Sequence, residues 1–283
     1  VLALGAEVNF FGVEGAAENG FPLYTLPDAV RLKDHVLERW EAADRDPSLV
    51  DDGALNVVVV GGGPTGVETA GALAELYNGV FKKDYPDVAP GTAKVTLVEA
   101  SPEIFSMFKP NIQEYAKEAL TKRGVEVSTG EVVASVTPKR VMLKSGDEIP
   151  AHTLVWGAGL QGNELVQSLG VELERGNRLG VDEQLRLPSH PEVFVVGDVA
   201  AITDAKTEQV LPQLGSVALQ SGEHVGETIG WLVAGIGIVA GTASLAATGT
   251  SSTTSLIIAA SLALVLGGLT TYTAAVRRRR VWT

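Results

Sequence analysis

The stretch from Asn56 to Tyr77, NVVVVGGGPTGVETAGALAELY, decides the fold. Its four valines form a continuous apolar run, which is typical of a central parallel strand that is buried on both faces. Gly61, Gly63 and Gly66 follow in the spacing G-x-G-x-x-G, and the residues after Gly66 predict a helix. A strand, a glycine turn and a helix in this order predict a unit that binds a dinucleotide.

Each glycine of this turn is expected to have its own physical task. Gly61 permits the tight turn, Gly63 lets the backbone approach a pyrophosphate, and Gly66 lets the helix pack closely on the strand. The pyrophosphate then lies against free N–H groups at the positive end of the helix, with Pro64 and Thr65 among the cofactor-binding residues. The alternative is a Gly-rich turn that holds no ligand.

A second predicted strand, KVTLVEA (Lys94 to Ala100), ends close to Glu99. A carboxylate at this position accepts hydrogen bonds from the adenosine ribose and repels a 2′-phosphate. No Arg follows in ASPEIF, so the sequence favours NADH over NADPH. The separation of Gly61 and Glu99 exceeds the usual spacing of about 20 residues. The segment NGVFKKDYPDVAPGTA is therefore expected to be an insertion between the first helix and the second strand.

Composition narrows the classes of function. The length of 283 residues predicts about two domains, and the formal net charge of −12 argues against a nucleic-acid binder. Cysteine is absent, which excludes disulfides, thiolate metal sites and dithiol redox centres. The four His residues lack metal-ligand spacing, so no metal site is expected. The sequence starts with VLALGAEVNFFG, which has neither an initiator Met nor the charged start of a signal peptide. We therefore expect a fragment of a longer chain.

The C-terminal part has a different character, because no charged residue occurs from Thr228 to Val276. Ile229–Ala247 and Ser255–Val276 are each long enough to cross a bilayer, which takes about 20 residues. Arg277–Arg280 follows at once, and such basic residues stay on the cytoplasmic side. The pattern predicts a transmembrane hairpin, with the globular part on the cytoplasmic side of the cell membrane. The alternative is a buried helical pair in a soluble core.

Several motifs together carry a resemblance to a known family: GGGPTGVETAGALAELY, the insertion with KKDYP, VTLVEASPEIFSMFKP, LVWGAGLQGNEL and VFVVGDVA. As a set they resemble type II NADH:quinone oxidoreductases, members of the two-dinucleotide-binding FAD/NAD(P) flavoproteins. The resemblance covers residues 1 to about 229. It implies an α/β, Rossmann-like fold in which an NADH domain interrupts a partial FAD domain. The implied domains are 1–52 and 151–228 for FAD, 53–150 for NADH, and 229–283 for the transmembrane hairpin.

The resemblance also implies an activity and its cofactors, FAD and NADH. Hydride passes from NADH to the flavin, and electrons continue to a membrane quinone without proton pumping. The absence of cysteine removes the relatives that reduce disulfides, which leaves a quinone, a ferredoxin-like protein or oxygen as acceptor. Membrane lipid and a second copy in a homodimer are further expected partners. The alternatives are a non-catalytic, membrane-anchored NADH-binding fragment and a ferredoxin-reductase-like flavoprotein.

Individual site residues follow from the same resemblance. VFVVGDVA is the second FAD signature, a buried strand that ends in Gly197, with the Asp198 carboxylate bonding the ribityl chain. The alternative for Asp198 is a helix cap or turn residue. Gly159 lies in WGAG, where the family has a crossover turn between domains. At the other crossover, Ala3-Leu4-Gly5 replaces the usual Ala-Thr-Gly, so a hydroxyl is missing.

Two more side chains are candidates for the chemistry. Glu68 is implied to lie near the meeting of nicotinamide and flavin, and its alternative is an ordinary first-turn glutamate favoured by the helix dipole. Quinone-reducing relatives carry the pattern Ala-Gln-x-Ala-x-Gln on a helix after the flavin Asp. Here Ala218 and Gln220 match its second half, whereas Gly215 and Ser216 replace its first half.

Overall fold

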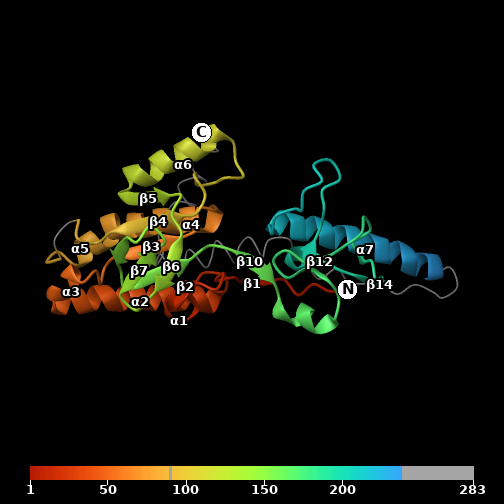
Figure 1. The fold of residues 1–283 in the computed structure, drawn as a ribbon, viewed down its shortest axis with the longest axis horizontal. Coiled ribbons are helices and arrows are strands. Elements are labelled where there is room, and N and C mark those ends of the chain that lie inside the picture. Colours follow the sequence, from red (N-terminus) through yellow and green to blue (C-terminus); the bar gives the residue numbers. More distant parts are fainter. Residues whose placement is uncertain (89–90, 238–283) are drawn as a thin grey trace, which may run out of the picture. The chain divides into compact units, whose positions relative to one another are not determined.

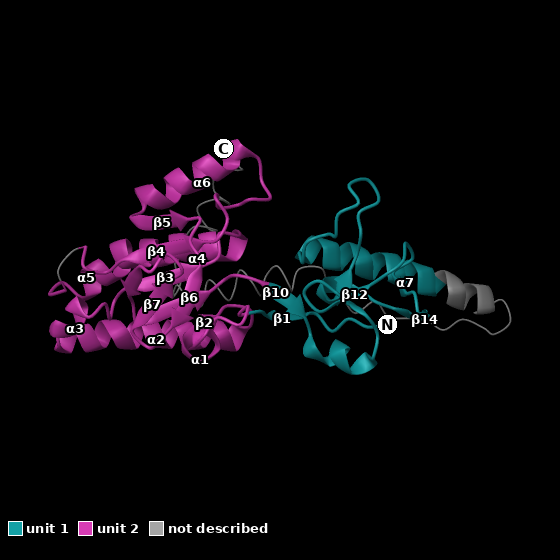
Figure 2. Cartoon of the chain, in the orientation of Figure 1, with its two compact units in different colours: residues 1–9, 160–256 teal, residues 10–159, 257–283 magenta. Residues whose placement is uncertain are grey.

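The computed structural model describes residues 1–88 and 91–237 (Figure 1). The chain divides into two compact units (Figure 2). Of the described residues, unit 1 contains 1–9 and 160–237, and unit 2 contains 10–88 and 91–159. The chain therefore leaves unit 1 after Asn9 and returns to it at Leu160.

Unit 2 is built on a five-stranded parallel sheet. Its strand order is β2-β9-β3-β4-β5, and each strand is parallel to its neighbours. The strands are β2 (Gly20–Pro22), β9 (Thr153–Trp156), β3 (Val57–Val60), β4 (Val95–Glu99) and β5 (Val125–Thr129). All four valines of β3 are buried, which confirms the prediction of a central strand covered on both faces.

Three helices cover one face of this sheet: α2 (Leu26–Arg45), α4 (Pro64–Leu76) and α6 (Pro110–Lys122). Their apolar side chains form one core with Val57, Val59 and Val155 of the sheet. Helix α2 begins with a capping box, in which Thr25 and Asp28 bond each other's backbone N–H groups. Short helices α1 (Ala16–Asn19) and α3 (Ser48–Asp51) lie in the segments before and after α2.

The expected insertion lies between α4 and β4, as predicted. It starts with a π-helical turn, η1 (Tyr77–Phe81), and α5 (Lys82–Asp84). The rings of Tyr77 and Phe81 pack on Trp40 of α2, with centroid distances of 5.1 and 4.8 Å. The insertion is thus fixed to the core through aromatic packing.

A second, antiparallel sheet of unit 2 contains β6 (Val133–Val136), β7 (Arg140–Leu143) and β8 (Glu148–Pro150). Asp52 ties this sheet to the segment before β3. Its carboxylate accepts hydrogen bonds from Lys139 Nζ at 2.6 Å and Arg140 Nη2 at 2.8 Å, and lies 3.2 Å from His152 Nε2. The hydrogen bonds from Lys139 and Arg140 hold the pKa of Asp52 well below its usual range. Burial lowers the pKa of His152, although Asp52 opposes this shift.

Unit 1 contains short strands around a smaller core of Val166, Leu179, Val195 and Val199. Strand β1 (Ala6–Val8) pairs antiparallel with β10 (Leu160–Gly162), so that Val8 lies opposite Leu160. The other elements of the unit are η2 (Glu164–Leu169), β11 (Leu173–Glu174), β12 (Arg178–Gly180), β13 (Arg186–Leu187), β14 (His190–Phe194), η3 (Gly197–Val199), β15 (Ala200–Ala201) and α7 (Gly215–Gly237).

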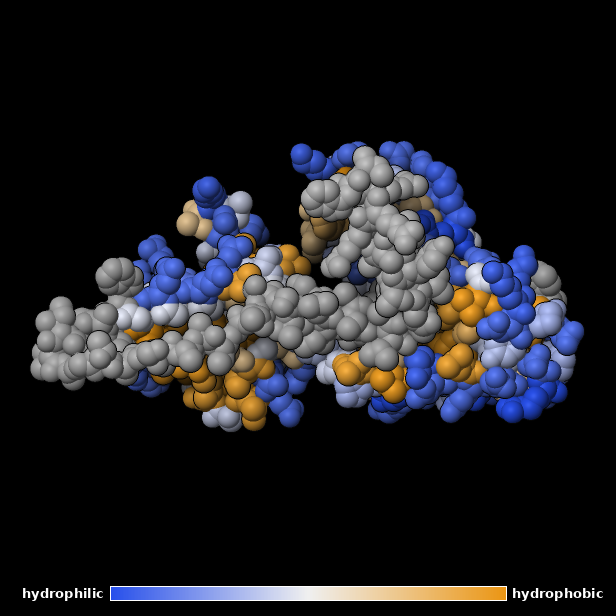
Figure 3. Space-filling model, turned by 180° about the vertical axis from the view of Figure 1, so that it is seen from behind, coloured by the Kyte–Doolittle hydropathy of each residue, from blue (hydrophilic) through white to orange (hydrophobic). Residues whose placement is uncertain are grey.

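Both units also carry apolar side chains at the surface. Examples are Phe11 and Tyr115 in unit 2 and Leu165 in unit 1. The space-filling view shows apolar patches on both units, between hydrophilic side chains (Figure 3). Exposed apolar atoms are common on folded proteins, so these patches alone do not indicate a site.

The unit boundaries differ from the expected ones. They fall at residues 9/10 and 159/160, whereas we expected 52/53 and 150/151. The reason is that β2 and β9 are neighbours in the parallel sheet of unit 2, and α2 packs into the same core. Residues 10–52 and 151–159 therefore belong to the unit that holds the glycine turn.

The expected hairpin falls mostly on undescribed residues. Helix α7 runs without a break through the expected boundary at Thr228, and Val225 and Ile229 pack together against Phe194 and Val196. Within residues 1–88 and 91–237, no helix has the length and apolar character needed to cross a bilayer. The predicted spans Ile229–Ala247 and Ser255–Val276 lie, apart from 229–237, outside the described residues.

Candidate dinucleotide-binding site

The order of the strands in unit 2 creates a switch point between β3 and β9. From β3 the chain continues through α4 to β4 on one side, while β9 pairs with β3 on the other side. Ligands of open α/β sheets bind at such a point, outside the carboxyl ends of the strands. Gly61 follows β3 and Gly157 follows β9, and the N–H of Gly157 donates to the Val60 carbonyl at 2.9 Å. The glycine turn therefore lies where a sheet of this topology binds its ligand.

The three glycines of the turn have different surroundings. Gly61 has φ +109°, and a Cβ on it would lie 2.9 Å from Ala158 Cα. A Cβ on Gly66 would lie 1.8 Å from the carbonyl oxygen of Gly61, which is far inside contact distance. A Cβ on Gly63 would meet no heavy atom of the described residues within 4 Å. Gly61 and Gly66 are thus required by packing, whereas the space beside Gly63 is open.

The beginning of α4 points its unpaired backbone donors at this open space. Gly63 is the N-cap, Pro64 opens the helix, and no side chain of the described residues caps it. The N–H groups of Thr65 and Gly66 consequently have no partner within the helix. They lie at the positive end of a 13-residue helix, which favours an anion.

Glu99 ends β4 beside the same turn. Its Oε2 accepts a hydrogen bond from the N–H of Gly62, and its Oε1 accepts one from the N–H of Ser101 at 2.6 Å. A carboxylate has about four acceptor positions, so both oxygens can accept further bonds from a ligand. Glu99 therefore also supports the glycine turn, which the sequence did not indicate.

The loop after β4, residues 100–109 (the β4–α6 loop), contacts the turn from its other side. The N–H of Phe105 donates to the Gly62 carbonyl at 2.7 Å, so the Gly62 peptide is bonded through both its N–H and its C=O. Phe105 has φ +53°, an uncommon conformation for a residue with a side chain. No sequence signal marks Phe105, because only Gly and Asn are typical of this conformation.

The remaining candidates of unit 2 are Glu68 and Gly159. Glu68 is the fifth residue of α4, and the first turn of this helix has no acidic residue. Glu68 thus lies just beyond the first turn, and its side chain is exposed. Gly159 is the last residue of unit 2 and has φ +72°, a conformation that favours glycine.

Gly197 and Asp198 lie in unit 1, where α7 supports them. Gly197 has φ +73°, and its N–H donates to Ser221 Oγ at 3.0 Å. Ser221 Oγ in turn donates to the Ala218 carbonyl at 3.0 Å. The strand before this turn is buried, as expected: Phe194, Val195 and Val196 lie in the core of the unit, and Leu2 pairs with Val195 as a parallel neighbour. Strand β14 also pairs antiparallel with β13.

Asp198 is half-buried within the turn η3. Burial raises the pKa of its carboxyl group, and the positive charge of Arg178 opposes this shift. In the described part of the chain the carboxylate has no hydrogen-bond partner, and it does not cap a helix. This disfavours a capping role and leaves acceptor positions for a ligand.

Arg178 of β12 is a polar residue that sequence reasoning missed. Its Nη1 donates to the Leu211 carbonyl at 3.0 Å and its Nη2 to the Ala200 carbonyl. The buried Nε has no partner among the residues that the structure describes. Burial lowers the pKa of its guanidinium, and Asp198 opposes this shift. Because nothing distinguishes this Arg from the others in the sequence, it could not be identified beforehand.

Gln220, the candidate for the acceptor side, is exposed on α7 and has no hydrogen-bond partner within the described ranges. The structure thus brings the glycine turn and Glu99 together in unit 2. Gly197, Asp198 and Gln220 are in unit 1. The open space at Gly63 fits a pyrophosphate, and the unpartnered Asp198 carboxylate fits the hydroxyl groups of a flavin ribityl chain.

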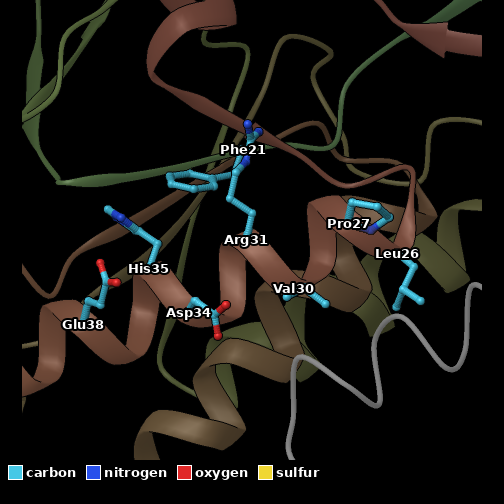
Figure 4. A pocket seen from close by; sticks show the side chains of 8 residues that line it. All are labelled: Phe21, Leu26, Pro27, Val30, Arg31, Asp34, His35 and Glu38. Carbon is cyan, nitrogen blue, oxygen red and sulfur yellow. The ribbon is translucent and has the colours of Figure 1, made fainter.

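A groove of about 790 Å³ also lies on unit 2, but it involves none of these candidates (Figure 4). Phe21 of β2 and residues from the first four turns of α2 line it, including Arg31 and His35. The imidazole of His35 packs on the ring of Phe21 at 4.5 Å, and its Nε2 lies 3.0 Å from the His152 carbonyl. His35 therefore joins α2 to β9, and the groove is separate from the glycine turn.

Comparison with protein families shows what these features belong to. The family model described as pyridine nucleotide-disulphide oxidoreductase matches residues 1–222. The chain belongs to this family. The α/β, Rossmann-like flavoprotein fold expected from the sequence is thereby confirmed.

Curated relatives support the more specific resemblance. The chain is 35% identical over 228 residues to the internal alternative NAD(P)H-ubiquinone oxidoreductase A1, mitochondrial, of Arabidopsis thaliana, covering 80% of this chain and 44% of the relative. It is 32% identical to a type II NADH:quinone oxidoreductase of Staphylococcus haemolyticus, covering 81% and 57%. The chain spans about half the length of the curated relatives it matches. The resemblance to type II NADH:quinone oxidoreductases is confirmed.

A solved structure agrees with these relatives. The structure of NDH2 from Plasmodium falciparum in complex with NADH matches with a TM-score of 0.66 and 25% identity, covering 71% of this chain and 43% of that chain. A ferredoxin reductase from Rhodopseudomonas palustris matches at 21% identity and a TM-score of 0.62, which shows the shared fold alone.

Proposed function

We propose that this chain binds NADH in unit 2 and FAD in unit 1, and that the protein passes hydride from NADH to the flavin and electrons on to a membrane quinone, without pumping protons. The observation that carries this proposal is the glycine turn beside Glu99 at the carboxyl ends of β3 and β9. The names of the relatives, which include NADH and quinone, support the choice of donor and acceptor.

The residues of unit 2 hold the dinucleotide. The N–H groups of Thr65 and Gly66 bind the pyrophosphate, because the open space beside Gly63 gives it access to them. Glu99 accepts hydrogen bonds from the adenosine ribose, and its negative charge disfavours a 2′-phosphate. Glu68, exposed on α4, orients the nicotinamide or takes part in proton transfer toward the acceptor.

The residues of unit 1 hold the flavin, which when bound accepts hydride and releases electrons. Asp198 accepts hydrogen bonds from the ribityl chain. Arg178 favours the ionised form of Asp198 against the effect of burial, which keeps the carboxylate an acceptor. Ala218 and Gln220 of α7 contact the quinone. Because the chain has no cysteine, electrons do not pass through a protein thiol.

The domain assignment and the membrane anchor are part of the proposal. We assign NADH to unit 2 and FAD to residues 1–9 and 160–228. The spans Ile229–Ala247 and Ser255–Val276 anchor the protein in the lipid bilayer, with Arg277–Arg280 and both units on the cytoplasmic side. An anchored protein meets an apolar quinone where it is concentrated. Homodimer formation remains a prediction.

One alternative has an observation in its favour. The glycine turn and Glu99 both lie in unit 2 and could bind NADH without a flavin, so a membrane-anchored NADH-binding protein without catalysis is the second candidate. Calorimetric titration with NADH, followed by anaerobic reduction of added FAD and then of a quinone, distinguishes the two. Reduction of both confirms the enzyme, whereas NADH binding without flavin reduction favours the alternative. Absence of NADH binding contradicts both.

A further inference from the structure

The β4–α6 loop is held by one side chain from the helix that follows it. Gln113 of α6 donates through Nε2 to the carbonyl of Phe108 at 2.9 Å and to the carbonyl of Phe105 at 3.2 Å. Gln113 is half-buried, and the two carbonyls lie on opposite sides of the loop tip at Ser106 and Met107. A single amide group therefore closes the loop onto α6.

The β4–α6 loop is also hydrogen-bonded to the glycine turn. Phe105 donates its N–H to the Gly62 carbonyl at 2.7 Å, and the N–H of Gly62 in turn donates to Glu99. The backbone of Phe105 is thus bonded through its N–H to the turn and through its C=O to Gln113. The two bonds fix the residue whose conformation is the least favourable in the loop, at φ +53°.

Such a conformation persists only where the surroundings fix it, and it occurs preferentially at ligand sites. The N–H of Phe108 also donates to the Phe105 carbonyl at 2.7 Å, and the rings of Phe105 and Phe108 pack edge-on at 5.1 Å, which adds two further restraints. Ile104, which precedes Phe105, is fully buried, and its Cγ2 would lie 3.0 Å from a Cβ added to Gly62. The loop and the turn therefore adopt their positions together.

We propose that Gln113 is a positioning residue for the adenosine half of the dinucleotide. It holds Phe105 in the conformation that bonds the Gly62 carbonyl, which keeps the Gly62 peptide and the Glu99 carboxylate in place for pyrophosphate and ribose. Gln113 itself does not contact the ligand. The inference rests on the proposed function, because it requires the glycine turn to bind a dinucleotide.

ADP-ribose is a suitable probe, because it contains the adenosine and pyrophosphate groups and requires no flavin. Calorimetric titration of the full chain is compared with titration of Gln113→Met, which keeps the length of the side chain and removes its donor. The expected result is a weakening of about 5- to 10-fold, as for the loss of two ordinary hydrogen bonds. Asn111→Ala is the matched control, because Asn111 is an exposed amide on the same helix without a hydrogen-bond partner in the described part of the chain. This variant should bind ADP-ribose as the unmodified chain does.

Gln113→Lys tests whether the donor itself matters. Its ammonium group can donate to both carbonyls, and about 0.5 M salt reduces its direct attraction to the pyrophosphate. At this salt concentration we expect affinity within about threefold of the unmodified chain, since donors are restored. Amide exchange at Phe105 should be faster in Gln113→Met and slow again in Gln113→Lys.

The outcomes separate this inference from the proposed function. If the unmodified chain fails to bind ADP-ribose, the proposed function is contradicted, and this inference with it. If the unmodified chain binds and Gln113→Met binds equally well, only the role of Gln113 is contradicted. A Lys variant as weak as the Met variant would show that a donor at this position has no part in binding. A lower melting temperature of Gln113→Met with unchanged ADP-ribose affinity would reduce Gln113 to a purely structural residue and overturn the inference.

Discussion

Gly63 and Gly66 are three residues apart in one turn, yet their substitution should have opposite consequences. In Gly66→Ala the new Cβ would meet the Gly61 carbonyl oxygen at 1.8 Å, so the helix or the turn must move. Such overpacking typically costs about 1–3 kcal/mol, and thermal unfolding should show it. Gly63→Ala has open space for its Cβ and should unfold like the unmodified chain.

NADH binding tests whether the open space beside Gly63 admits the pyrophosphate. Gly63→Ala should lose most of its affinity, because the methyl group occupies the space through which the pyrophosphate reaches the helix. Gly71→Ala is the control, since its Cβ would make only an ordinary contact with Leu120 at 3.5 Å. A Gly63→Ala protein that binds NADH normally would show that the turn holds no pyrophosphate.

Glu99 has two tasks in the structure, and two substitutions can separate them. Glu99→Ala removes the acceptors for Gly62, Ser101 and the ribose, and NADH binding should weaken by about 1–3 kcal/mol. Glu99→Gln removes the charge and keeps one acceptor oxygen, so it loses only one of the two backbone hydrogen bonds, and NADPH should gain relative to NADH. Calorimetry with both nucleotides measures the difference. Equal discrimination in Glu99→Gln and the unmodified chain would contradict the role of the charge.

At the residue scale, the sequence predicted what depends on local pattern. The positions of Gly61, Gly63, Gly66 and Glu99 could be found because a dinucleotide turn requires small residues and a carboxylate at set places. Arg178 and Gln113 could not be found, because their roles depend on carbonyl groups brought to them by the fold. Polar side chains that bond distant backbone carry no periodic signal.

At the scale of elements, the charged contact between Asp52 and the β6–β7 turn predicts a dependence of stability on pH. Because Lys139 and Arg140 lower the pKa of Asp52, the folded state binds fewer protons there than the unfolded state. The stabilisation is present above the ordinary Asp pKa of about 3.9 and is lost as the pH falls through the lowered pKa. Chemical unfolding below about pH 4 should therefore show a steeper loss of stability than Asp52→Asn shows.

His152 is expected to cause a second decrease in folding stability, at a higher pH than Asp52. Burial lowers its pKa, so the folded state again binds fewer protons, and stability should fall as the pH drops through about 6.5. His35 changes in the same direction, because burial lowers its pKa as well. His152→Gln should reduce this step and leave that of Asp52 in place. A protein equally stable at pH 7 and pH 5.5 would contradict the assignment to buried neutral histidines.

The elements predicted from strong patterns agree with the structure, and those inferred at boundaries do not. β3, β4 and α4 are correct because a valine run, a short β-branched apolar strand and a helix after a glycine turn are local features. The boundary of the compact unit differs from the expected domain boundary at 52/53, because α2 and β2 join the sheet of unit 2 through contacts that are remote in sequence. The buried strand before Gly197 is also correct, because VFVV is a local apolar run.

For the whole molecule, the proposed anchor makes a prediction about membrane association. A hydrophobic hairpin should keep the chain in the membrane pellet after washing with high salt and carbonate, because its attachment does not depend on charge. Removal of residues 238–283 should release it, and this truncation leaves α7 intact. Truncation at Thr228 would also remove the contact of Ile229 with the core of unit 1, so it is the poorer choice. Full release of the intact chain by salt alone would contradict two spans.

The pairing of β1 with β10 has a consequence for how such a protein can be taken apart. Val8 and Leu160 lie opposite each other, so the chain leaves unit 1 and re-enters it at neighbouring points. The two ends of unit 2 therefore lie close together. Unit 2 can therefore be expressed alone as residues 10–159, or exchanged for the equivalent segment of a relative, because a connection of only a few residues joins its two ends.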